Sequence, residues 1–138
     1  MDRVATTVAI ALGSNLGDRR AHLDDAVERL SAILTGVRIS ALIETEPVDV
    51  LEPQPPYLNG VIVGETTLSP RELLAAMHAI EAHQGRERVS YHAARTLDLD
   101  LILFGAEIIT EPGLTVPHPR YRHRAFVLDP LKSVAPEL

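Results

Sequence analysis

The spacing of hydrophobic residues changes several times along the chain, and each change predicts a new element. Residues 4–12, rich in Val, Ile and Ala, predict a buried strand, and apolar residues at helical spacing over 20–34 predict a helix that ends at Gly36. Alternation over 37–43 predicts a second strand, and residues 58–65 predict a third. Ser69 and Glu72 form a capping-box pattern, which predicts a second helix that ends near Gly85. Residues 97–104 predict the fourth strand.

The segments between these elements are predicted to be loops and short elements. Residues 45–56 contain four prolines and no periodicity, and residues 86–94 are polar without a pattern, so both predict loops. Gly105 predicts a turn into a short strand around Ile108 and Ile109, and residues 116–119 predict an extended segment. A short helix near residues 121–128 would direct Phe126 inward.

The predicted element order is β-α-β-β-α-β, followed by a C-terminal extension that carries the short helix. This order is typical of an α+β, ferredoxin-like fold, with an antiparallel sheet and both long helices on one face. One domain spanning residues 1–138 accounts for the whole pattern. The other sheet face, with the loops at its edge, is then available for a binding site.

Composition narrows the class of protein. The chain has 138 residues, 46% of them hydrophobic, which suffices for a core, and it has no cysteine, which excludes disulfides and thiolate metal sites. The net charge of −6 argues against nonspecific nucleic-acid binding. No apolar run is long enough for a membrane span, and the N-terminus does not have the pattern of a signal peptide. We expect a cytoplasmic monomer that binds neither nucleic acid nor membrane.

The run from Arg95 to Ile102 carries the strongest functional pattern. In a strand, Asp98 and Asp100 share the face opposite to Leu97, Leu99 and Leu101, and their carboxylates stand roughly 7 Å apart. Aspartate is disfavoured in strands, and two like charges at this spacing repel each other. A pair of hard oxygen ligands suits Mg²⁺ held against a polyphosphate, although a solvated polar strand face explains the spacing equally well.

Arginines gather around this aspartate pair in an otherwise acidic chain. Guanidinium groups match phosphate oxygens bidentately, so the cluster favours binding of a small anion over simple solvation. Its members, within 39 positions, are Arg86, Arg88, Arg95, Arg120, Arg122 and Arg124.

Other candidates are weaker when taken singly. Tyr57 could stack on a flat heterocycle and Asn59 could read its edge, although packing at a sheet edge explains Tyr57 as well. Phe126 fits a core position, and His118, between two prolines, favours a hydrogen-bonding role over a metal ligand. Residues 13–17 lack the ending of a phosphate-binding loop, so we interpret them as a structural turn.

These residues together resemble the 6-hydroxymethyl-7,8-dihydropterin pyrophosphokinase family of folate biosynthesis. The two most specific runs are Arg95-Thr96-Leu97-Asp98-Leu99-Asp100 and Leu114-Thr115-Val116-Pro117-His118. Further matches run almost from end to end: Gly13-Ser14-Asn15-Leu16-Gly17, Tyr57-Leu58-Asn59, Glu81, Gln84-Gly85-Arg86, Arg88, Arg124-Ala125-Phe126 and Ala135-Pro136.

The resemblance implies transfer of the β,γ-pyrophosphoryl group of ATP to the hydroxymethyl group of a reduced pterin, with release of AMP. It implies that Asp98 and Asp100 hold two Mg²⁺ ions and act in catalysis with Arg86 and Arg95. The implied pterin site consists of Thr45, Val48, Tyr57, Asn59 and Phe126. The implied nucleotide site consists of Glu81, Arg86, Arg88, Arg95, Leu101, Thr115, His118 and Arg124.

The chain departs from the family pattern at several positions. His92-Ala93-Ala94 stands where a Trp-Gly-Pro run is usual, His78 replaces a common Gln, and Gly113 replaces a frequent Arg. These changes spare the aspartate pair and alter the loop expected to close over it. Two alternatives therefore stay open: a paralogue with the same ATP–Mg²⁺ chemistry on another hydroxymethyl compound, and a non-catalytic remnant that binds pterin or nucleotide.

Overall fold

The computed structural model describes residues 4–45, 56–84, 97–118 and 125–137, and for 125–129 it describes the helix to which they belong but not their side chains. Its elements follow in the order β1 (Thr6–Ser14), α1 (Arg19–Ser31), β2 (Thr35–Ile39), β3 (Ile43–Thr45), β4 (Tyr57–Thr66), α2 (Pro70–His83), β5 (Asp98–Phe104), β6 (Ile109–Glu111), β7 (Leu114–Val116) and α3 (Ala125–Val134).

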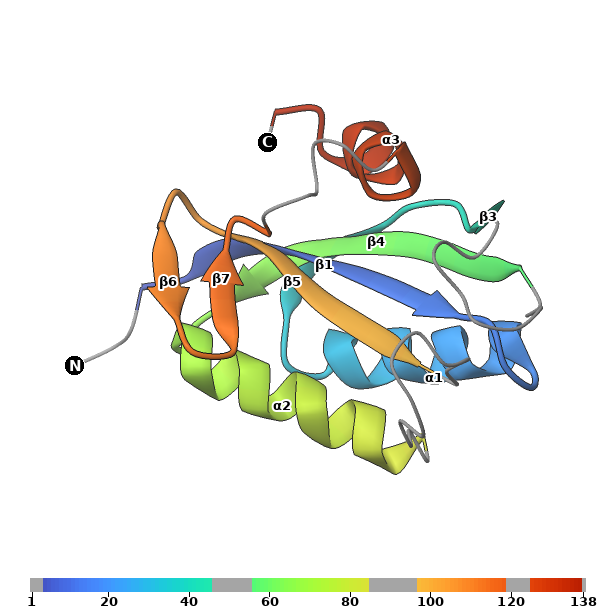
Figure 1. Cartoon of the computed structure of the whole chain (residues 1–138). Helices are drawn as coiled ribbons and strands as arrows, with labels where there is room; N and C mark the ends of the chain where they lie inside the picture. The colour runs from blue at the N-terminus through green and yellow to red at the C-terminus, as the bar shows by residue number, and fades with distance from the viewer. Residues whose placement is uncertain (1–3, 46–55, 85–96, 119–124, 138) are drawn as a thin grey trace.

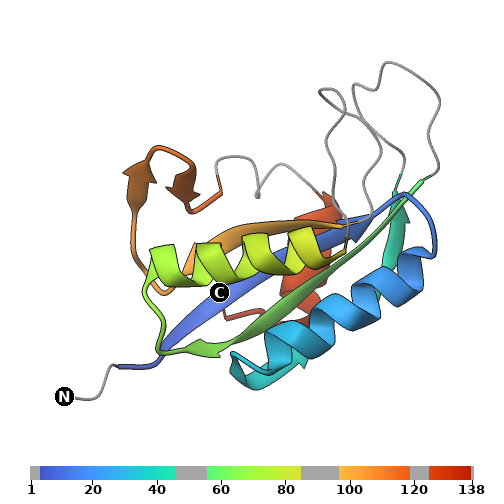
Figure 2. The same cartoon turned by 90° about the horizontal axis from the view of Figure 1, so that it is seen from below.

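The fold is α+β, and its main sheet is antiparallel. The strand order is β2-β4-β1-β5, with β3 also paired to β4, while β6 and β7 form a separate hairpin. Helices α1 and α2 cover one face of the sheet and α3 covers the other (Figure 1). Seen from the helix side, α1 and α2 lie next to each other across the sheet (Figure 2). No helix in the described part of the chain is long and apolar enough to cross a membrane.

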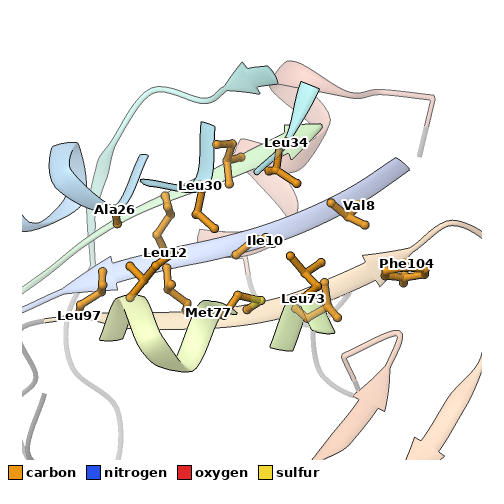
Figure 3. Packing of buried hydrophobic residues seen from close by; sticks show 14 of the residues in the cluster. Val8, Ile10, Leu12, Ala26, Leu30, Leu34, Leu73, Met77, Leu97 and Phe104 are labelled. Carbon is orange, nitrogen blue, oxygen red and sulfur yellow. The ribbon is translucent and has the colours of Figure 1, made fainter. Parts of the chain in front are cut away.

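The main core lies between the sheet and helices α1 and α2. Ile10 and Leu12 of β1 meet Leu30 of α1 and Met77 of α2 there, and each of the four is at most 2% exposed (Figure 3). The alternation of the strand and the helical repeat of the helices bring these side chains to one layer. Burial of this surface is what orders the two helices on the sheet.

Local sequence signals fix where the two helices begin. The Asp18 carboxylate accepts a hydrogen bond from the Ala21 amide at 3.1 Å at the start of α1. At α2, the Ser69 hydroxyl accepts from the Glu72 amide at 3.2 Å, and the Glu72 carboxylate accepts from the Ser69 amide at 2.8 Å. The predicted capping box is therefore confirmed.

The predicted second strand is wrong in one respect, because it is two strands. The Ser40 hydroxyl accepts from the Val61 amide at 2.8 Å, and the Ser40 amide donates to the Val61 carbonyl at 2.9 Å. A side-chain oxygen thus takes a place in the hydrogen-bond ladder, and regular pairing stops at Ile39. It resumes at Ile43, where β3 begins.

Two further predictions concern the part of the chain near the C-terminus. The last helix, predicted near 121–128, is described over 125–134 and therefore ends later than expected; residues 121–124 lie outside the described residues. Val116, the first residue of the extended segment predicted over 116–119, is the last residue of strand β7. Gly113 adopts a positive φ of 74°, which lets the chain turn back so that β7 pairs with β6.

Candidate active site

Three strands present a row of facing residues at one end of the sheet. Gly13 of β1 lies between Asn59 of β4 and Asp98 of β5, and each pair is in register. Directly opposed residues of antiparallel strands share a face, so Asn59 and Asp98 project to the same side across the gap left by a glycine. Asp100 follows on that face, opposite Ala11. The predicted aspartate pair is therefore on one face, with Asp98 half-buried and Asp100 exposed.

Three of the residues expected to bind the pterin lie together on β3 and β4. The Asn59 amide nitrogen donates to the Thr45 hydroxyl at 2.5 Å, and Thr45 is in register with Tyr57. Asn59 is 7% exposed, so this bond fixes a buried amide. Val48 lies outside the described residues, and the side chain of Phe126 does too, although Phe126 belongs to α3.

Gly13 has a role that its sequence neighbourhood did not reveal. It lies within β1 rather than in the predicted turn, which the structure places after Ser14. A Cβ at this position would lie 2.8 Å from the Asn59 Oδ1 atom and 3.5 Å from Tyr57 Cδ1. The glycine therefore makes room for the amide of Asn59. No signal in one sequence could have shown this, because the contact crosses two strands.

A cavity of about 310 Å³ opens between α2, β5 and the β6–β7 hairpin. It brings together three of the residues expected to bind nucleotide, namely Leu101, Thr115 and His118. Asp100 lines the same cavity, so one member of the aspartate pair faces it. His78 of α2 lines it as well. The cavity thus brings a candidate metal ligand, Asp100, next to residues expected to bind the nucleotide.

Glu81, also expected at the nucleotide, is not among the residues lining this cavity. Its side chain is 6% exposed, and its Oε2 atom accepts a hydrogen bond from the Leu99 amide at 2.9 Å. Leu99 lies between Asp98 and Asp100, so this carboxylate holds the strand that carries the pair.

Backbone and side-chain contacts hold the hairpin wall of the cavity. The His118 amide donates to the Ile102 carbonyl at 3.0 Å, which joins the end of the hairpin to β5. At the other end, the Arg71 guanidinium on α2 donates to Glu111 at 3.0 Å and to the Pro112 carbonyl at 2.9 Å. Arg71 carried no functional signal in the sequence, since an exposed helical arginine is ordinary.

Polar contacts also anchor the residues that flank segments 46–55 and 85–96. Arg19 donates to Glu44 at 2.6 Å and to the Pro56 carbonyl at 2.8 Å, so it joins the two ends next to the first segment. Before the second segment, the side-chain amide of Gln84 bonds His22 through its oxygen at 2.7 Å and donates from its nitrogen to the Asp25 carboxylate. The expected phosphate-binding residues Arg86, Arg88, Arg95 and Arg124 lie outside the described residues.

The carboxylates suit a metal whose other ligands come from a substrate. Within the described ranges, no group of three or more His, Cys, Asp or Glu residues could form a complete metal site. Asp98 and Asp100 offer two hard oxygen donors on one face, and Mg²⁺ is commonly held by one or two carboxylates together with phosphate and water. The donor set therefore fits Mg²⁺ bound with a polyphosphate.

The sequence is similar to a known protein family and to several named proteins. A model of the 7,8-dihydro-6-hydroxymethylpterin-pyrophosphokinase family matches residues 9–136. Three similar bacterial proteins are each named 2-amino-4-hydroxy-6-hydroxymethyldihydropteridine pyrophosphokinase. The protein of Pseudomonas aeruginosa is 44% identical over 95% of this chain and 82% of its own length. That of Bacillus subtilis is 43% identical over 94% and 78%, and that of Haemophilus influenzae 40% over 96% and 83%.

An α+β fold with two carboxylates on one strand face beside a cavity is compatible with a protein that binds a polyphosphate together with a metal ion. The chain belongs to the 7,8-dihydro-6-hydroxymethylpterin-pyrophosphokinase family. The resemblance found in the sequence is confirmed.

Proposed function

We propose that this protein transfers the β,γ-pyrophosphoryl group of ATP to 6-hydroxymethyl-7,8-dihydropterin in folate biosynthesis. One observation supports it best: the aspartate pair lies between the two expected substrate sites. Asp98 shares its row with Gly13 and Asn59, whereas Asp100 lines the cavity with Thr115 and His118. Pterin and nucleotide on these two sides would meet at the carboxylates.

The chain's own residues supply alignment and binding in this proposal. Asn59 and Thr45, with Val48, would read the edge of the pterin, and its ring would lie between Tyr57 and Phe126. Leu101, Thr115 and His118, with Glu81 nearby, would hold the nucleoside. Arg86, Arg88, Arg95 and Arg124 would bind the phosphates.

The reaction requires little chemistry from side chains. The pterin hydroxyl oxygen bonds to the β-phosphorus of ATP, the bond from that phosphorus to the α–β bridging oxygen breaks, and AMP and the hydroxyl proton leave. Asp98 and Asp100 would hold two Mg²⁺ ions, which supply charge neutralisation and a lower pKa of a bound hydroxyl. Positioning and electrostatics dominate such transfers, which agrees with the lack of a general base among the candidates.

Three finer predictions accompany this function. The strand order is compatible with the ferredoxin-like arrangement expected from the sequence. We expect the protein to act as a monomer in the cytoplasm. ATP and the reduced pterin would be its only partners.

The deciding experiment incubates the protein with Mg²⁺, ATP and 6-hydroxymethyl-7,8-dihydropterin and measures AMP. AMP that forms only with the pterin supports the proposal. ATP binding without AMP favours a paralogue with another hydroxymethyl substrate, and absence of ATP binding favours a non-catalytic remnant. The loop residues His92-Ala93-Ala94 motivate both alternatives, because they replace the usual Trp-Gly-Pro run.

A further inference from the structure

A buried carboxylate reaches the backbone between the two aspartates. Glu81 of α2 is the only charged residue among the buried residues in the described part of the chain. Burial of a charged group costs free energy unless hydrogen bonds compensate it. The Leu99 amide provides such a bond at 2.9 Å. Packing alone does not explain why a charged side chain is buried at this place on the strand.

The strand that receives the bond is at the edge of the sheet. β5 pairs with β1 on one side, and on the other no strand of the main sheet lies beside it among the residues that the structure describes. The amides of an edge strand that point outward need partners from elsewhere. Glu81 supplies one from a helix, through a charge-assisted bond that is stronger than a neutral one.

This edge strand has a particular need for support. Asp98 and Asp100 are poor strand formers that repel each other, and Leu99 is the residue between them. The Leu99 side chain is 7% exposed and packs in the main core, which restrains one side of the backbone. The bond from its amide to Glu81 restrains the same residue along the edge.

We infer that Glu81 is a positioning residue, which fixes the β5 backbone so that Asp98 and Asp100 hold their spacing for Mg²⁺. This inference rests on the proposed function for its metal and nucleotide. It differs from the implied role of Glu81 as a nucleotide contact. Groups that hydrogen-bond metal ligands directly commonly change metal affinity or activity by about 10- to 100-fold when replaced, and we expect an effect on this scale for Glu81, which bonds the backbone between the two aspartates.

The test compares three variants. Glu81→Met keeps the length of the side chain and removes the acceptor, and Glu81→Gln keeps an acceptor without the charge. Met77→Ala is the matched control, since it truncates a side chain on the same helix that is 1% exposed and does not bond β5. Glu81→Ala replaces Glu81→Met if the latter does not fold.

Two readouts do not depend on turnover. Amide hydrogen exchange at Leu99 reports the bond itself, and electron paramagnetic resonance of Mn²⁺ with a non-hydrolysable ATP analogue reports metal affinity. We expect Glu81→Met to exchange Leu99 about tenfold faster and to bind Mn²⁺ about 10- to 100-fold more weakly. Glu81→Gln should stay within a few-fold of the original protein in both, and Met77→Ala should retain its Mn²⁺ affinity.

Two results would overturn the inference. Unchanged Mn²⁺ affinity in Glu81→Met, with weaker binding of the metal-free analogue, would make Glu81 a nucleotide contact. A matching loss of Mn²⁺ affinity in Met77→Ala would reduce the effect to general stability. Failure of the proposed function is distinguishable, because it appears as absence of AMP in the unsubstituted protein, whereas exchange at Leu99 is measured without any substrate.

Discussion

On β1, Ile10 and Leu12 point toward α1 and α2, whereas Ala11 and Gly13, the residues next to Leu12, point to the opposite face. The first face carries large branched side chains that fill the space beneath two helices. The second face carries small residues on β1, next to Val61 and Val63 of β4, and farther along the strands it becomes polar at Asn59 and Asp98. Strand β1 therefore contributes large side chains to the core beneath α1 and α2, and small residues to the face that carries the candidate site.

The difference separates stability from binding. Large apolar side chains on the α1–α2 face make the backbone positions of β1, β4 and β5 rigid. Small side chains on the other face leave room for the Asn59 amide and expose the aspartate pair. The contrast predicts that substitutions on the two faces should differ in whether they change stability or activity.

The largest expected effect is on activity. Asp98→Ala and Asp100→Ala should each lower turnover on the order of a thousandfold, because each removes a ligand that neutralises phosphate charge. The unfolding temperature should change little, since neither side chain belongs to the apolar core. AMP formation and thermal unfolding measure the two quantities. Asp24→Ala, an exposed aspartate on α1, is the control. Near-normal turnover in both variants would contradict the mechanism.

The second prediction concerns stability. Leu12→Ala should lower the free energy of unfolding by about 2–5 kcal/mol, because it leaves a cavity in the densely packed face. Leu131→Ala in α3 is the matched comparison, since both leucines are 2% exposed. Chemical denaturation measures both losses. Leu131 packs in a smaller cluster than Leu12, with three alanines among its seven buried residues, so its site can collapse more readily. If Leu131→Ala lowered the free energy of unfolding more than Leu12→Ala, the α1–α2 face would not be the one that contributes more to stability.

A smaller effect is expected at Gly13. Gly13→Ala should raise the KM for the pterin about tenfold, because the new Cβ displaces the Asn59 Oδ1 atom from a distance of 2.8 Å. Stability should change little, since the displaced atom is the end of a side chain. A double-mutant cycle with Asn59→Ala tests the cause. If the two effects on KM add fully, Gly13 does not act through Asn59.

The comparison also explains what the sequence could predict. The periods of 3.6 and 2 identified α1, α2 and the core face, and the spacing of Asp98 and Asp100 placed both on one side of a strand. These signals are local. The capping residues Ser69 and Glu72 are local as well, and they marked the start of α2 correctly.

Contacts between distant segments could not be predicted in this way. Ser40 interrupts a strand by bonding Val61, and Glu81 bonds Leu99, 18 positions away. Gly13 makes room for a side chain on another strand. Each of these residues has an ordinary local pattern, and only the folded chain supplies the partner that gives it a role.

The smallest expected effect concerns how α3 is held to its face. Arg38 of β2 donates to the Val134 carbonyl at 2.8 Å and pairs with Glu137 at 2.6 Å. The hydrogen bond from Arg38 and a backbone hydrogen bond lower the pKa of Glu137 below its ordinary value. The α1–α2 face has the larger apolar cluster, so burial supplies more of what holds its helices, in addition to polar contacts such as that of Glu81 with Leu99.

A carboxylate whose pKa is lower in the folded state than in the unfolded state stabilises the fold. This stabilisation is fully present at a pH above the ordinary pKa of the group, which is about 4.3 for glutamate. It disappears as the pH falls through the lowered pKa of the folded state. Glu137→Gln should therefore lower the unfolding temperature slightly at pH 7, and the difference should vanish in acid below the lowered pKa. The effect is small because solvent screens an exposed pair. Thermal unfolding over that pH range measures it, with Glu65→Gln, an exposed carboxylate on β4, as control. A difference that persists undiminished in acid would show that the Glu137 charge does not help to hold α3, and the two faces would then depend on apolar burial alike.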